Sequence, residues 1–541
     1  MKQKLLKGLL LGLACIGVLT FLLPKRVSAA PPSSIFVNGF DIISDADHTI
    51  QCGKGTAVYD PTTGVLTLVS AQIYTPDSLG CGIYSDGDLS IILDGNTSIS
   101  NCINGIKAAG NITIKDITNG GLSILGDVND GNGINSSNGS IDIKLKGDIN
   151  LSSTSTCISA QDSIYLTCNK LDIYAAKYDS VGISCRNSIS ISTVSDISVR
   201  AGYKGISSND GAINIECSQG AINVECRQIG VIGLNSVVTI SSFSNIHISS
   251  TETPSRQYTH AGISAEILQI ESLNGSIYIS GNHSPAISTY GNISALAEEG
   301  SFECGGIWVS DGTISIAAKD AVISSDTYGV QTHTHISICG KVTITGGIQA
   351  LYPHLNEASG EIVIAEVPGS IRKIITADNT TGNNAQEYTG PISLLDNSIY
   401  KYIRVSYTTP VKAMVLNKSN LSMLEGSSDE LVPMFTPADA TNHKVTWSSS
   451  NSSIVLIDNG KVTALKPGNA IITATSEDGN ITASCAITVT SNTSPTPISP
   501  APTVPSVPDT GDTNSYWLYI LLFSASALII IYPLVRRSLK H

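Results

Sequence analysis

The stretches Ser140-Ile141-Asp142-Ile143-Lys144-Leu145 and Ala212-Ile213-Asn214-Ile215-Glu216-Cys217 decide the fold of this chain. In both, apolar and polar residues alternate with a period of two, the pattern of a β-strand with one buried and one exposed face. An α-helix would instead place its apolar residues three and four positions apart. This region is therefore expected to consist of short strands.

Both stretches belong to a phrase that recurs along the chain: a small residue, then Ile or Val, a few polar residues, and alternating Ile. The phrase begins at Gly82-Ile83, Gly105-Ile106, Gly133-Ile134, Cys157-Ile158, Gly182-Ile183, Gly205-Ile206, Gly230-Val231, Gly262-Ile263, Ala286-Ile287, Gly306-Ile307 and Gly329-Val330. The starts lie about 25 residues apart, and strands repeating at such a period indicate a solenoid.

We therefore predict an all-β chain dominated by a long parallel β-helix of about eleven coils, in which Ile side chains stack inside and Ser, Thr and Asn cover the outside. Leucine-rich repeats are disfavoured because Leu is not the repeated residue. Irregular coils of about 25 residues favour the right-handed form. Residues 30–79 are expected to cap the N-terminal end, residues 80–375 to form the β-helix, and residues 376–409 to form a C-terminal cap and connector.

The N-terminal part of this region resembles a known family. Its segments are Ile35-Phe36-Val37-Asn38-Gly39, Tyr59-Asp60-Pro61-Thr62-Thr63-Gly64-Val65-Leu66-Thr67-Leu68 and Gly82-Ile83-Tyr84-Ser85-Asp86-Gly87-Asp88-Leu89. They resemble extracellular β-helical proteins of anaerobic Gram-positive bacteria that are described as carbohydrate-binding. The resemblance implies a polysaccharide or host glycan as ligand and calcium as the candidate cofactor, but it carries no binding residues onto this chain.

Residues 410–491 contain short apolar runs separated by turn signals, which predict a small β-sandwich of about seven strands. The segments Val445-Thr446-Trp447-Ser448-Ser449-Ser450-Asn451, Gly460-Lys461-Val462-Thr463-Ala464-Leu465-Lys466-Pro467-Gly468 and Cys485-Ala486-Ile487-Thr488-Val489 resemble the group 2 bacterial immunoglobulin-like domain. The resemblance implies a spacer role, with adhesion as the alternative. Trp447 is expected in the core rather than in a sugar-binding platform.

Residues 1–29 are typical of a secretory signal peptide. Lys2, Lys4 and Lys7 precede an apolar run, and Val27-Ser28-Ala29 precede Ala30 with the small-residue spacing that a signal peptidase accepts. Cleavage is expected between Ala29 and Ala30. A retained membrane anchor, or a lipoprotein attached through Cys15, is the alternative.

The C-terminus combines three elements in order. Residues 492–506 are rich in Pro, Ser and Thr, which favours an extended linker. Val507-Pro508-Asp509-Thr510-Gly511 follows, and the apolar run 516–535 then ends in basic residues, as expected of one transmembrane helix with a cytoplasmic basic end.

Residues 507–541 resemble the cell-wall sorting signal of Gram-positive surface proteins, although Val507 stands where the usual motif has Leu. The resemblance implies that a sortase cuts between Thr510 and Gly511 and joins Thr510 to peptidoglycan. The protein is then secreted and attached to the cell wall, and its precursor is held by the C-terminal transmembrane helix. A simple membrane-anchored protein is the alternative.

The composition excludes nucleic acid as a partner. The net charge is −13, and charged residues make up only 14% of the chain, compared with about 25% in average proteins. A nucleic-acid-binding protein needs a basic surface, which this balance does not provide.

Two groups of residues are candidates for metal binding. Asp127, Asn129, Asp130 and Asn132 lie in a Gly-rich turn, and such oxygen ligands suit calcium. The alternative is an ordinary turn, because the glycine spacing of a standard calcium loop is missing; Asp86 and Asp88 form a weaker version of the same pattern. His333 and His335 would share one face of a strand, but zinc needs further ligands, so an exposed polar pair is expected.

Most cysteines are expected to be buried thiols in the internal ladders. Several fall inside the repeat, namely Cys157, Cys185, Cys217, Cys226 and Cys304. Small apolar side chains suit such stacked positions. Disulfides between neighbouring coils, about 4.8 Å apart, remain the alternative.

Three functions fit this organisation: a glycan-binding or adhesive surface, a structural spacer, and a polysaccharide lyase or hydrolase. Binding is favoured because hydroxyl and amide side chains can hydrogen-bond sugars. Aromatic rings could stack on sugars at Tyr84, Tyr174, Tyr178, Tyr203 and Tyr290. We expect no catalytic residues, because no cluster of acids and bases stands out; only Arg186 and Arg227 fall at comparable local positions, just after a cysteine.

Overall fold

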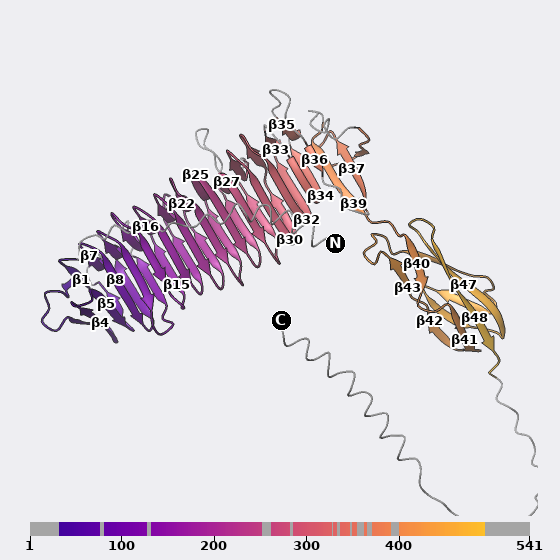
Figure 1. Ribbon diagram of the computed structural model, residues 1–541, viewed down its shortest axis with the longest axis horizontal. Coiled ribbons are helices and arrows are strands. Elements are labelled where there is room, and N and C mark those ends of the chain that lie inside the picture. Colours follow the sequence, from indigo (N-terminus) through magenta and orange to yellow (C-terminus); the bar gives the residue numbers. More distant parts are fainter. Residues whose placement is uncertain are drawn as a thin grey trace, which may run out of the picture. The chain divides into compact units, whose positions relative to one another are not determined.

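The computed structural model describes residues 32–492, apart from 76–79, 127–130, 252–260, 282–284, 327, 333–335, 347–348, 354–361, 365–369 and 391–399 (Figure 1). Every regular element among these residues is a β-strand. The described part of the chain contains no helix that is long and apolar enough to cross a membrane. The expected signal peptide, the proline-rich linker and the sorting signal with its helix at 516–535 lie outside the described residues.

The larger of two compact units is a parallel β-solenoid of roughly ten turns. Each turn contributes one strand to each of three stacks of parallel strands, so that neighbours within a stack come from successive turns. Successive turns follow one another along the part of Figure 1 that runs from indigo through magenta.

Stack 1 carries the recurring phrase. Its strands are β7 (Cys81–Ser85), β10 (Asn104–Ala108), β13 (Ile134–Ser136), β16 (Thr156–Ala160), β19 (Val181–Cys185), β22 (Lys204–Ser208), β25 (Ile229–Ser242), β27 (Ile263–Ser272), β29 (Ile287–Thr289), β31 (Ile307–Val309), β33 (Tyr328–Thr332) and β35 (Gln349–Pro353).

Stack 2 follows in each turn. It contains β5 (Val65–Val69), β8 (Leu89–Asp94), β11 (Ile112–Asp116), β14 (Ile141–Lys144), β17 (Ile164–Cys168), β20 (Ile189–Thr193), β23 (Ile213–Cys217), the later parts of β25 and β27, β30 (Ile293–Cys304), β32 (Ile314–Ser325), β34 (Ile336–Gly346) and β36 (Ile362–Ile364).

Stack 3 completes the turn. It contains β6 (Gln72–Tyr74), β9 (Thr97–Cys102), β12 (Leu122–Gly126), β15 (Ile149–Ser153), β18 (Leu171–Ala175), β21 (Ile197–Arg200), β24 (Ile222–Cys226), β26 (Ile246–Ser250) and β28 (Ile277–Ser280), and the later parts of β30, β32 and β34. The long strands β25, β27, β30, β32 and β34 therefore each belong to two stacks, which the period-two pattern alone did not predict.

The predicted repeat is confirmed residue by residue. Ile83, the first position of the phrase, pairs in register with Ile106, and the same ladder continues through every predicted start as far as Val330. It extends one turn further, to Leu351, which the phrase did not mark. These side chains are fully buried, so each turn covers the apolar face of the one before it.

The small residue before each Ile has a steric cause. A Cβ at Gly182 would lie 2.5 Å from the carbonyl oxygen of Gly205 on the next turn and 2.5 Å from a methyl group of Val199. The glycines that begin most other turns face the following turn in the same way. Close backbone approach between turns therefore favours a small residue, most often glycine, although Cys157 and Ala286 occupy the same position in two turns.

Antiparallel strands cover both ends of the solenoid. At the N-terminal end these are β1 (Ile35–Val37), β2 (Phe40–Asp41), β3 (Thr49–Cys52) and β4 (Gly55–Asp60), and β1 pairs antiparallel with β7. At the other end they are β37 (Ile371–Ala377), β38 (Gln386–Glu387) and β39 (Tyr402–Thr408). Because β39 pairs antiparallel with β34, it occupies the strand edge that another parallel turn would need.

Residues 413–490 form a small β-sandwich-like region. Its strands are β40 (Ala413–Leu416), β41 (Asn420–Leu424), β42 (Ser428–Glu430), β43 (Pro433–Thr436), β44 (Val445–Ser449), β45 (Val455–Asp458), β46 (Lys461–Ala464), β47 (Gly468–Ser476) and β48 (Thr482–Thr490). They form sheets of two, four and three strands. Leu431, Val455, Ile472 and Cys485 form part of the core, and Trp447 packs against it, as expected.

We predict that Gly182→Ala destabilises the solenoid by about 1–3 kcal/mol, because its methyl group would meet backbone of the next turn. The matched control is Gly80→Ala, since a Cβ there meets nothing within 4 Å. This control is expected to be neutral or stabilising by up to about 1 kcal/mol. Urea unfolding compares the two, and equal midpoints would refute the steric explanation.

Candidate functional site

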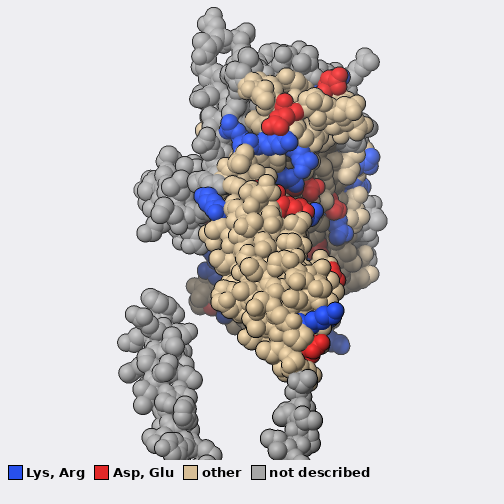
Figure 2. All heavy atoms as spheres, turned by 90° about the vertical axis from the view of Figure 1, so that its right-hand side faces the viewer, with Lys and Arg blue, Asp and Glu red and all other residues tan. Residues whose placement is uncertain are grey.

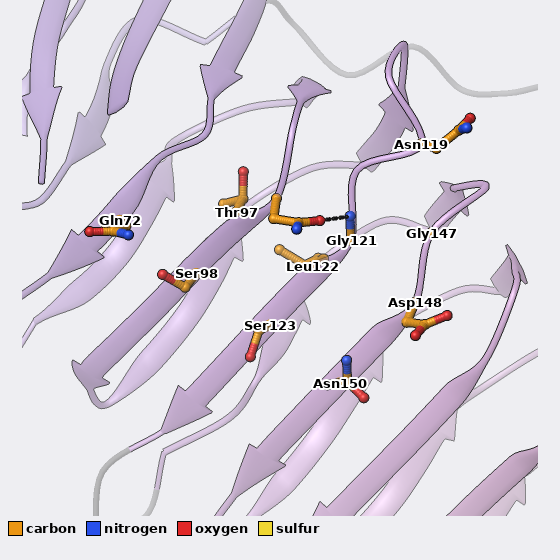
Figure 3. A pocket seen from close by; sticks show the side chains of 11 residues that line it. Gln72, Thr97, Ser98, Asn119, Gly121, Leu122, Ser123, Gly147, Asp148 and Asn150 are labelled. Atoms are coloured by element: carbon orange, nitrogen blue, oxygen red, sulfur yellow. Dashed lines mark hydrogen bonds between the residues drawn. The ribbon is translucent and has the colours of Figure 1, made fainter. Parts of the chain in front are cut away.

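A row of polar side chains runs along the outer surface of stack 3. Gln72, Ser98, Ser123 and Asn150 are exposed and lie in register on β6, β9, β12 and β15 (Figure 3). We call these four residues the polar stripe. The same ladder continues through Asp172, Ser198 and Asn223. The alternation of each strand turns Ile inward and these residues outward, so the repeat that forms the core also aligns the stripe.

The stripe borders a surface pocket of about 480 Å³. The opposite side of the pocket is formed by the corner between stacks 2 and 3, with Asn96, Asn119 and Asp148. Asn96 Oδ1 accepts a hydrogen bond from the Gly121 amide at 2.8 Å, and Asp148 Oδ1 accepts one from Asn169 Nδ2 at 2.7 Å. Asn96 and Asp148 therefore have structural partners.

The stripe residues differ from this corner. Within the part of the chain that the structure describes, the side chains of Gln72, Ser98, Ser123 and Asn150 make no intramolecular hydrogen bond. Their hydroxyl and amide groups consequently remain available to a ligand. Two residues after each stripe position, the same strands point a second side chain outward. In this second row Tyr74, Leu125 and Tyr174 are each at least half exposed.

The tyrosines singled out in the sequence do not form one surface. Tyr84 lies on the outer face of β7, with its ring 6.2 Å from that of Phe36. The Arg227 guanidinium lies 4.2 Å from the ring centre of Tyr178, and Lys204 lies 5.2 Å from that of Tyr203. Tyr174 faces outward from β18, and Tyr290 contacts Trp308.

The structure separates the two arginines that the sequence placed at comparable positions. Arg186 follows β19, at the corner between stacks 1 and 2, and pairs with Asp210 at 3.3 Å. Arg227 follows β24, at the corner between stacks 3 and 1. A cysteine precedes both, but this local pattern does not specify which corner follows. The similar local sequence therefore does not bring the two residues to the same corner of the solenoid.

Charged side chains cover a minor part of the surface. On the face seen in Figure 2, acidic and basic residues lie close to one another among a larger area of uncharged residues. Several ion pairs link successive turns, among them Lys341 with Asp320 at 2.7 Å and Arg200 with Glu225 at 3.9 Å. Such exposed pairs contribute little to stability.

The predicted calcium residues Asp127, Asn129 and Asp130, and the pair His333 and His335, lie outside the described residues. Among the described residues, no cluster of three or more His, Cys, Asp or Glu side chains could hold a metal ion.

The weaker acidic pair, Asp86 and Asp88, has a structural role. Asp86 accepts hydrogen bonds from the backbone amides of Ser33 and Ser34, at 2.9 and 3.0 Å, and hydrogen bonding, first of all from the Ser33 hydroxyl, lowers its pKa. Asp88 accepts hydrogen bonds from the backbone and side chain of Asn111 on the next turn.

Several cysteines end a strand of the solenoid at buried positions where neighbouring turns have serine, threonine or alanine, namely Cys168, Cys185, Cys217 and Cys226. Cys185 lies in register between Ala160 and Ser208, and its thiol donates to the Asn187 carbonyl at 3.3 Å. Thr193 makes the equivalent contact with Ser195 at 2.6 Å. All ten cysteines for which a state is described are free thiols. Burial raises the pKa to about 12 for Cys157, Cys168, Cys185, Cys226 and Cys304.

Comparison with known proteins identifies one domain. Residues 410–487 match the family of bacterial Ig-like domains (group 2), which confirms the resemblance noted in the sequence. The match does not extend over the solenoid.

Several curated proteins are similar to parts of the chain. An uncharacterised protein of Clostridium acetobutylicum is 39% identical over 122 residues, which cover 22% of this chain and 29% of the relative. An alpha-L-arabinofuranosidase of Bifidobacterium longum is 37% identical over 99 residues, covering 17% of this chain and 9% of the enzyme. A lacto-N-biosidase of Bifidobacterium bifidum is 41% identical over 73 residues, covering 13% and 6%. The chain thus spans less than a third of each of these relatives.

We predict that Cys185→Ser changes the free energy of unfolding by less than about 1 kcal/mol, because a hydroxyl fits the same position in the stack of small residues. In contrast, Cys185→Leu is expected to cost about 1–3 kcal/mol by overpacking. Urea denaturation measures both, and an equal loss in the two variants would contradict the proposed equivalence of thiol and hydroxyl.

Proposed function

We propose that this protein is a cell-surface polysaccharide-binding protein whose solenoid binds glycan chains along the polar stripe. The observation that carries the proposal is the register of Gln72, Ser98, Ser123 and Asn150 on four successive turns beside a pocket of about 480 Å³. Hydroxyl and amide groups without intramolecular partners are suited to the hydroxyl groups of sugars.

The spacing of the stripe supports a polymer rather than a single sugar. Successive strands of a sheet lie about 4.8 Å apart. This distance is close to the length of one sugar unit in an extended polysaccharide. A chain lying along the solenoid axis would therefore meet one stripe residue with each unit, and many weak contacts would add up along its length.

The comparisons are compatible with this function. Two of the relatives that share a segment with this chain are glycoside-processing proteins by name, an alpha-L-arabinofuranosidase and a lacto-N-biosidase. The shared parts are only 9% and 6% of those proteins, so neither enzyme's activity is carried over to this chain. The Ig-like domain would then act as a spacer.

We further propose that the mature protein is attached to peptidoglycan through Thr510 after cleavage by a sortase, and that residues 1–29 are removed on secretion. The support is the order of Val507-Pro508-Asp509-Thr510-Gly511, the apolar run 516–535 and the basic end. The solenoid is proposed to be right-handed, because its coils are long and irregular, and calcium is the candidate cofactor.

To test glycan binding, residues 30–492 are run through gels containing pectin, xylan, cellulose derivatives or mucin. We expect at least one polysaccharide to retard the protein, and Gln72→Ala combined with Asn150→Ala to remove most of the retardation. The matched control is Asn214→Ala, which removes an outward amide from β23 in stack 2.

If a chelator removes the retardation, calcium is needed for binding, and Asp127 and its neighbours become the candidate calcium ligands. Unchanged mobility in every gel would contradict the proposal and favour a spacer. Shortening of a polysaccharide on incubation would favour a lyase or hydrolase.

Wall attachment predicts that Thr510→Ala abolishes the covalent link. In the native Gram-positive host, the protein is expected in the wall fraction released by peptidoglycan hydrolases, and the variant in the membrane fraction. Fractionation with detection by antibody measures both. An unchanged distribution would leave a membrane-anchored protein as the better account.

A further inference from the structure

A pair of aromatic side chains interrupts the polar outer face of stack 1. β31 turns Ile307 and Val309 inward and Trp308 outward. Trp308 lies in register with Ser288 on the preceding turn and Gln331 on the following turn. Because Trp308 points outward between two polar residues, it adds nothing to the core. A partly exposed aromatic ring at such a position indicates a binding surface.

The ring of Tyr290, at the adjacent corner, packs against the ring of Trp308. Tyr290 directly follows β29 and is 63% exposed. Its ring centre lies 6.3 Å from that of Trp308, and the ring planes meet at 70°. This edge-to-face arrangement is a favoured one for aromatic pairs and limits the rotation of both rings. The result is a fixed, partly exposed aromatic surface.

Two carboxylate residues lie on either side of Tyr290. The Gly291 amide donates to the Glu266 carbonyl at 2.6 Å, and the Asp311 amide donates to the Tyr290 carbonyl at 2.7 Å. Glu266 and Asp311 therefore occupy the same corner one turn before and one turn after. Both are exposed, and among the described residues neither pairs with a lysine or arginine.

We propose that Tyr290 and Trp308 form a binding site for a neutral pyranose unit of a polysaccharide. A pyranose ring has an apolar face of C–H groups, which packs on an aromatic surface. The hydroxyl groups at its edge can donate hydrogen bonds to carboxylates, and they can exchange hydrogen bonds with side-chain amides in either direction. The two carboxylates repel anionic sugars, so the site selects for neutral ones. The proposal rests on the proposed glycan-binding function and adds a second contact region with a defined ligand class.

An organic cation is the other ligand that aromatic rings and carboxylates attract. Sites for quaternary ammonium groups surround the cation with a cage of rings. Here two rings meet at 70°, and their neighbours in register, Ser288 and Gln331, are hydrogen-bonding side chains suited to hydroxyl groups. A neutral sugar is therefore the better fit.

The test is a fluorescence titration of the full chain, which contains three tryptophans. Xylan and mixed-linkage β-glucan are the neutral probes, polygalacturonate is the anionic probe, and choline is the cationic probe. We expect a saturable change in tryptophan fluorescence with at least one neutral probe and none with the other two. Trp308→Phe is expected to abolish the change, and Tyr290→Ser to weaken binding about tenfold.

Two controls test whether the response depends on this site. Phe40→Ser removes a 65% exposed aromatic side chain from β2, which belongs neither to the stripe nor to this aromatic pair, and is expected to leave the titration unchanged. Asp311→Asn is expected to retain neutral binding and to admit polygalacturonate.

A fluorescence change that persists in Trp308→Phe would overturn the proposal, because it would place the ligand at Trp447 or Trp517. A response to choline would also overturn it in favour of a cation site. Gel retardation without any change at Trp308 would refute this site and leave the proposed function intact, whereas the absence of both would refute both.

Discussion

The close parallel contact between successive turns is the constraint on which the rest of this structure depends. A turn of the solenoid cannot bury its own apolar face, so it is stable only against a neighbour in the same register. At Gly182 that contact is so close that a side chain would collide with the carbonyl oxygen of Gly205. The glycine column thus fixes how near the turns approach, and the isoleucine ladder beside it provides the apolar burial that holds them together.

The same register also determines what the surface can do. Because strands alternate, a residue placed outward on one turn lies directly over an outward residue on the next. Polar residues accordingly form rows such as the polar stripe, and an aromatic residue such as Trp308 lies between the polar residues of neighbouring turns. Binding surfaces in this fold are therefore linear, and their chemistry is set by one position in each turn.

The core could be predicted from sequence because its requirements recur in every turn. Each predicted start from Ile83 to Val330 lies in the observed ladder, since only a small residue followed by Ile or Val fits there. The outer surface could not be predicted in the same way. Gln72 and Asn150 belong to one row, but outward positions carry different polar residues, and Gln72 precedes the recognisable repeat. The corners vary in length, so the sequence pattern did not reveal that Arg186 and Arg227 lie at different corners or that Tyr290 contacts Trp308. Aligning the outward positions of successive turns would have identified the stripe.

The covering strand β39 shows that the number of turns is set at the end of the solenoid rather than within it. It pairs antiparallel with β34, whereas the interior turns present nearly the same glycine and isoleucine columns to one another. Duplication of one internal coil would thus require no new interface and would lengthen the rod by about 4.8 Å. Each duplication would also add one residue to every outer row, so that any repetitive polymer bound along a row would meet one more contact. Recombination between coils would then change both the length of such a protein and the number of contacts that each row offers.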